Sequence, residues 1–106
     1  MPSVFDEREN DVIRQCLIAV LDGPFIDDWE FETRLGFDRP TLREILSAHD
    51  QSGYKPKYPE LSLAVNNCMN EIANGVTISP EKWARWFTVP KQMVESTLLK
   101  WNAIKS

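Results

Sequence analysis

The chain has 106 residues, of which 42% are hydrophobic, and it carries a formal net charge of −4 with a pI near 4.9. This length fits one domain of ordinary size, and no run approaches the roughly 20 apolar residues of a membrane-spanning helix. Two cysteines and one histidine are too few for a zinc site. The acidic start lacks an apolar signal core, so we expect a cytoplasmic protein. We also expect no metal and no cofactor.

The first predicted helix begins near Val12 and ends at Gly23. Its apolar residues follow the i, i+3, i+4 spacing of an amphipathic helix: Val12, Ile13, Cys16, Leu17, Val20 and Leu21. Gly23 is expected to take the left-handed conformation that often ends a helix. An extended connector follows, with Phe25 or Ile26 turned inward.

The stretch from Phe31 to His49 has the pattern of a helix, a glycine turn and a second helix. Asp27 followed by Glu30 is close to a capping box for the first of these helices. Asp38 is predicted to cap the second. The apolar residues on either side of the turn have helical spacing: Phe31, Leu35, Leu42, Ile45 and Leu46, with His49 behind them.

Residues 50–63 are predicted to link two helical segments, because two X-Pro steps favour extended backbone there. We expect Tyr54 and Tyr58 to pack at the junction rather than to face a partner. Pro59 suits a first helical position. The following helix is rich in asparagine, which predicts either a plain polar face or amide hydrogen bonds to the first half or to a partner; these residues are Asn66, Asn67, Asn70 and Asn74.

The last third begins with Ser79-Pro80-Glu81, a strong helix start. Three aromatic residues then stand at i, i+3 and i+4 positions: Trp83, Trp86 and Phe87. Core packing accounts for two of them. The final helix is predicted from about Pro90, with these residues turned inward: Val94, Leu98 and Trp101.

The two halves of the chain share this pattern at a constant offset of 52 residues. The identical pairs are Cys16 and Cys68, Gly23 and Gly75, Ile26 and Ile78, and Leu46 and Leu98. We therefore predict an all-α fold over residues 1–106, in which two tandem three-helix units, 12–49 and 64–101, pack as one domain. Chance resemblance between two amphipathic segments is the alternative. Both cysteines are expected to be buried, reduced and unreactive.

The acidic cluster after the first helix does not indicate catalysis. Its carboxylates lie in the first turn of a helix, where negative charge is favourable, and no histidine is close in sequence; the cluster consists of Asp27, Asp28, Glu30 and Glu32. The chain offers no pair of nucleophile and base and no cluster of metal ligands. We therefore expect a protein that is not an enzyme.

The unit from Trp29 to His49 resembles the helix-turn-helix of tri-helical DNA-binding domains, with Gly36 in the turn. The resemblance implies that residues early in the second helix face the bases. These candidates are Arg39, Thr41 and Arg43, with Lys91, Gln92 and Glu95 in the second unit. The second unit departs from the pattern at Thr88 and Pro90. The chain is also similar to small bacterial proteins of unknown function, which implies no activity.

Charge and aromatic content favour a protein partner over DNA. Residues 12–49 carry a formal charge of −3 and residues 64–101 carry +1, whereas DNA-binding domains usually present a basic face. Trp86 stands where the first unit has Arg34, so its position need not be apolar. We predict that Trp86, Arg85 and Lys82 lie at a homodimer or partner interface. DNA binding through the second unit is the alternative.

Overall fold

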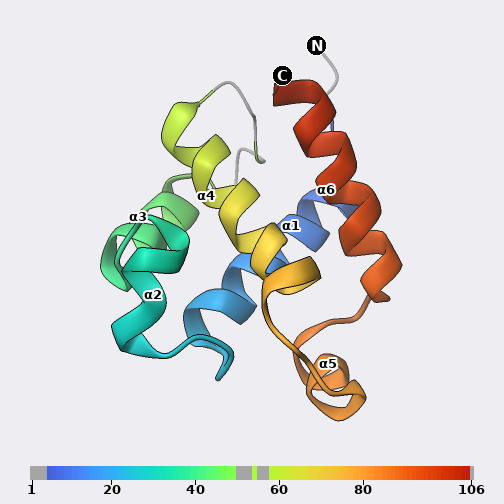
Figure 1. The fold of residues 1–106 in the computed structure, drawn as a ribbon. Helices are drawn as coiled ribbons and strands as arrows, with labels where there is room; N and C mark the ends of the chain where they lie inside the picture. Colours follow the sequence, from blue (N-terminus) through green and yellow to red (C-terminus); the bar gives the residue numbers. More distant parts are fainter. Residues whose placement is uncertain (1–4, 50–53, 55–57, 106) are drawn as a thin grey trace.

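The computed structural model describes residues 5–49, 54 and 58–105, and this part of the chain is all-α (Figure 1). Its elements are α1 (Glu7–Asp22), α2 (Asp28–Leu35), α3 (Arg39–His49), α4 (Pro59–Asn70), the π-helical turn η1 (Glu71–Gly75), α5 (Pro80–Trp86) and α6 (Lys91–Lys105). The predicted all-α class is confirmed. Within the described residues, no helix is long and apolar enough to cross a membrane. The side chain of His49 and most of the predicted linker lie outside the description.

The centre of the molecule is the contact between α1 and α4, and α3 and α6 each pack against both of these helices (Figure 1). Cys16 in α1 and Cys68 in α4 are free and fully buried there, as predicted. Burial raises the pKa of both thiols, and charge on Cys16 raises the pKa of Cys68 further. Both thiols are therefore protonated at neutral pH.

The first helix begins earlier than the sequence predicted. Glu7, not Val12, starts α1, because Asp6 and Glu9 form a capping box. The Asp6 carboxylate accepts the backbone N–H of Glu9 at 2.8 Å, and the Glu9 carboxylate accepts that of Asp6 at 3.0 Å. The capping box predicted at Asp27 is wrong, since its side chain makes no capping hydrogen bond to α2.

Gly23, which follows α1, does not have the predicted left-handed backbone. Gly23 has φ −80° and ψ 167°, which is extended backbone. Gly36, at the end of α2, has φ 80° and is the one glycine with positive φ among the described residues, so Gly75 lacks it too. Gly23 is required for space instead, because a Cβ there would lie 2.4 Å from the carbonyl oxygen of Ala19.

Each helix of the second half begins 52 residues after a helix of the first half. The pairs of helix starts are Glu7 and Pro59, Asp28 and Pro80, and Arg39 and Lys91. The helix that begins at Pro59 finishes in η1, where the N–H of Val76 donates to the carbonyl of Glu71 at 2.9 Å. The matched helix α1 finishes with a regular α-helical bond from Gly23 to Ala19.

Two amide side chains join the halves of the molecule. Gln15 in α1 donates to the hydroxyl of Thr88 at 2.8 Å and accepts the backbone N–H of the same residue at 3.0 Å. Asn67 in α4 donates to the carbonyl of Leu35 at 2.9 Å. This bond satisfies a carbonyl at the C-terminal end of α2, where helices leave such groups unpaired. Asn67 thus makes an amide hydrogen bond to the first half, which was one of the alternatives for the asparagine-rich helix.

The first turn of α1 is fastened to α6. The ring centroid of Phe5 lies 5.3 Å from that of Trp101, which is fully buried. Lys100 donates to both carboxylate oxygens of Glu9, at 2.8 and 2.9 Å. Tyr54 is also buried, as predicted, whereas Tyr58 is exposed.

Candidate interaction surface

Arg39, the first candidate for a base contact, is engaged within the protein. Its guanidinium donates to the carbonyls of Leu21 at 2.5 Å and Ile26 at 2.8 Å, and to that of Val20 at 3.3 Å. It also pairs with Asp28 at 2.8 Å. Arg39 therefore closes the C-terminal end of α1, where a cation is favourable and carbonyls lack helical partners.

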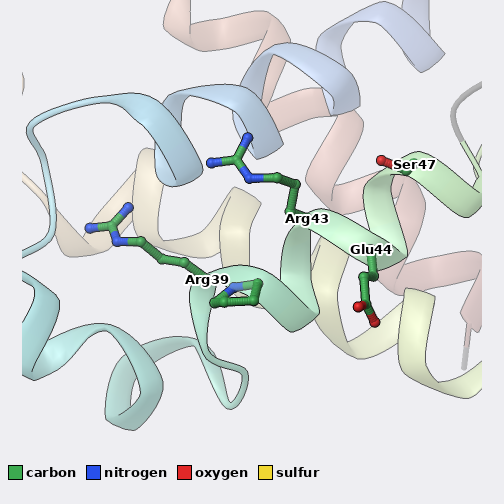
Figure 2. Close-up of a pocket in the computed structure, with 5 residues that line it drawn as sticks. Arg39, Arg43, Glu44 and Ser47 are labelled. Atoms are coloured by element: carbon green, nitrogen blue, oxygen red, sulfur yellow. The ribbon is translucent and has the colours of Figure 1, made fainter.

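Arg43 is likewise paired, with Asp22 at the end of α1, at 2.9 Å. Figure 2 shows the side chains of Arg39 and Arg43 extending from α3 toward α1, while Glu44 points to the other side. An open hollow of about 600 Å³ lies along this helix, lined by Arg39, Pro40, Arg43, Glu44 and Ser47. Thr41 is exposed beside it. Glu44 has no ion pair with a described residue, so this face of α3 contains one carboxylate without such a pair and two arginines already paired with carboxylates.

The candidates at the start of α6 are differently placed. Lys91, Gln92 and Glu95 are all exposed. Lys91 has no ion pair with any described residue, in contrast to Arg39 at the matching position of α3. At this position the second half therefore has an exposed lysine without such an ion pair, whereas the first half has an arginine that is bonded within the protein.

Trp86 is half-buried at the end of α5. Its ring meets that of Phe25 edge to face, with centroids 6.2 Å apart. Trp83, one turn earlier, stacks on the buried ring of Phe87 at 4.2 Å and donates to the carbonyl of Val89 at 2.8 Å. The tryptophans of α5 thus pack along the edge of the core, and no side chain of this helix is fully buried.

Lys82 and Arg85, the predicted neighbours of Trp86, are exposed, and neither forms an ion pair with a described residue. Their helix lies at the lower end of the molecule in Figure 1, connected to its neighbours by extended segments. The arrangement leaves a half-buried tryptophan next to two free cations.

The most exposed large hydrophobic side chain of the described residues is Trp29, for which the sequence predicted no role. It lies in the first turn of α2 with 79% of its surface exposed. Asp27 and Glu32 flank it, and both are exposed and have no ion pair with a described residue. Helical spacing already indicates this exposure, because it places Trp29 away from the face that contains Phe31 and Leu35.

These two groups of residues belong to one part of the molecule, which we call the α2–α5 face. It comprises an acidic side, with Asp27, Trp29 and Glu32, and a basic side, with Lys82, Arg85 and Trp86. The N-terminal end of α2 and the whole of α5 lie along the lower end of the molecule in Figure 1. The contact between Phe25, just before α2, and Trp86 joins the two sides.

Among the described residues, no three His, Cys, Asp or Glu side chains gather as metal ligands would. Comparison of the chain with family models, curated proteins and solved structures finds no match. The case for function therefore depends on the surface itself.

Proposed function

We propose that the chain is a tandem duplication of a three-helix, helix-turn-helix-like unit, and that the two units pack about an approximate two-fold axis. Reciprocal contacts support this. The offset of 52 residues pairs Gln15 with Asn67 and Thr88 with Gly36. Gln15 binds Thr88, and Asn67 binds Leu35 directly before Gly36. A contact together with its reciprocal is what two-fold symmetry produces.

The pairs of packed helices also support this proposal. The contact of α1 with α6 has its counterpart in that of α4 with α3, and the contact of α1 with α3 in that of α4 with α6. Cys16 and Cys68 are counterparts at this offset, and both are buried. Superposition of the two units in an experimental structure would test the duplication, and helices connected in different directions in the two units would refute it.

We propose that the protein is a non-catalytic module that binds another protein through the α2–α5 face. The exposure of Trp29 is the observation that carries this proposal. Its counterpart in the second unit is Glu81, which is also exposed, so the fold requires no apolar group at this position. Tryptophan is enriched at the energetic centres of interfaces, where a large rigid ring supplies most of the binding energy.

Affinity capture from an extract of the source organism tests this function with two matched variants. Trp29→Glu introduces the residue found at the counterpart position. Leu99→Ser does the same for another strongly exposed apolar side chain, which is 72% exposed and corresponds to Ser47. We expect proteins that are retained by the wild type and by Leu99→Ser to be lost with Trp29→Glu. Equal retention by all three proteins would refute the proposal.

DNA binding through the second unit is the alternative function. It is favoured by the free cations Lys82, Arg85 and Lys91 and opposed by the acidic charge of the first unit. A gel-shift titration with duplex DNA over several salt concentrations separates the two functions. Tight, salt-sensitive binding that is lost in Lys91→Glu would favour the alternative.

A further inference from the structure

We propose that the partner of the α2–α5 face is a second copy of this chain, in a closed two-fold dimer where α2 of each copy lies on α5 of the other. This inference depends on the proposed function and names its partner. The structure offers both halves of a complementary contact on one face. This surface can therefore bind the same surface of a second copy of the chain.

The charges on the two sides of the face are opposite and free. Asp27 and Glu32 on the acidic side have no ion pair with a described residue, and the same is true of Lys82 and Arg85 on the basic side. Several other charged groups of α2 and α3 are paired within the protein, for example Arg34 with Glu71. Glu81 on α5 is a further exposed carboxylate without an ion pair to a described residue, so the unpaired groups are acidic at the start of α2 and have a net positive charge on α5.

The position of the two sides allows the assembly to close. Phe25, just before α2, contacts Trp86 of the basic side, so the two sides are adjacent. A two-fold axis near this aromatic pair would bring each acidic side onto a basic side, twice in the same dimer. Contacts of this isologous kind end at two copies, whereas complementary patches on opposite sides of a molecule build open chains.

Trp29 contributes apolar area at the middle of the contact, which the charged groups alone would not provide. Exposed ion pairs contribute little by themselves, so the four charges mainly set orientation and encounter rate. Burial of the indole, which is 79% exposed in one copy, supplies the apolar area. The guanidinium of Arg85 in the second copy is the matching group, since arginine stacks favourably on tryptophan.

Sedimentation velocity of the wild type gives the first test, from about 1 μM to about 1 mM protein, the range that covers weak affinities. We expect a reversible monomer–dimer equilibrium with no larger species. The dimer should weaken in about 1 M salt, where charges are screened beyond about 3 Å. A wild type that stays monomeric throughout would overturn the inference.

Charge exchange gives the decisive test. D27K/E32K makes both sides of the face basic, and K82E/R85E makes both sides acidic, so each variant alone should dimerise more than about ten-fold more weakly than the wild type. In an equal mixture, both contacts of the mixed dimer again join opposite charges, and dimers should return. The chain with all four substitutions should also dimerise. Far-UV circular dichroism checks the fold, since all four side chains are exposed.

Three results would overturn the inference: a monomeric wild type, a dimer that the exchanges leave unchanged, or variants that fail to associate on mixing. Failure here is distinguishable from failure of the proposed function. If Trp29→Glu abolishes capture of other proteins while the wild type is monomeric, the binding function stands and the second copy is excluded as partner. If Trp29→Glu changes neither capture nor association, both proposals fail.

Discussion

Arg39 is expected to be among the most important polar side chains for stability, although it is only partly buried. Replacing it with alanine removes the donor from three carbonyls at or after the C-terminal end of α1. The two short bonds, to Leu21 and Ile26, are worth about 1.5 kcal/mol each as hydrogen bonds to a charged group. The longer bond to Val20 and the pair with exposed Asp28 add little. We therefore expect Arg39→Ala to lower the free energy of unfolding by about 3 kcal/mol.

Arg43 provides the matched control, because it lies one turn away on α3 and reaches toward the same helix. Its ion pair with Asp22 is about half-exposed on both sides, so Arg43→Ala should cost less than about 1 kcal/mol. Arg39→Lys should fall between the two variants, since an ammonium group cannot reproduce the fork of a guanidinium.

Urea unfolding followed by far-UV circular dichroism measures these differences at constant m-value. In thermal unfolding, each kcal/mol should lower Tm by about 4–8 °C for a domain near this size. The reasoning is refuted if Arg39→Ala costs no more than Arg43→Ala. That result would mean that water replaces the guanidinium at these carbonyls without loss.

Three other predictions concern single positions. Gly36→Ala should cost about 1 kcal/mol or somewhat more in urea unfolding, because φ 80° is unfavourable for a residue with a Cβ, and an unchanged midpoint would contradict this. Cys16 and Cys68 should react with a polar thiol reagent no faster than the protein unfolds, since burial raises both pKa values; rapid labelling of the native protein would contradict this. Hydrogen bonds from Thr41 lower the pKa of Asp38 below its usual 3.8, so its contribution to stability is complete above about pH 4 and is lost as the pH falls through the lowered pKa. Asp38→Asn should flatten the acid limb of the unfolding midpoint between about pH 4 and pH 2, and an unchanged limb would refute this.

The helices could be predicted because hydrophobic periodicity is local information. Leu42 and Val94, for example, are fully buried on the faces that their spacing indicates. Helix starts were predictable where a cap is followed by a strong signal, as at Ser79-Pro80. The start of α1 was missed because its first turn is polar, so periodicity only becomes visible at Val12.

The site was harder to predict, since it depends on what each side chain meets in space. Arg39 has the sequence position of a base-reading residue, but the end of α1, distant in sequence, lies against it. Trp86 is half-buried against Phe25, a contact that its spacing in the sequence does not indicate. Trp29 was overlooked because an acidic cluster surrounds it in the sequence, although its spacing from Phe31 already placed it on the outer face of α2.

The attachment of α1 to α6 has a consequence for local motion. Helix ends normally fray independently, so the amide hydrogens of their last turns exchange quickly. Here the first turn of α1 cannot open without separating Phe5 from Trp101 and Glu9 from Lys100. Amides in these two segments, about 90 residues apart in the chain, should therefore exchange as one cooperative unit. Loosening either segment would expose the other to proteases, so both helices set the lifetime of the folded protein.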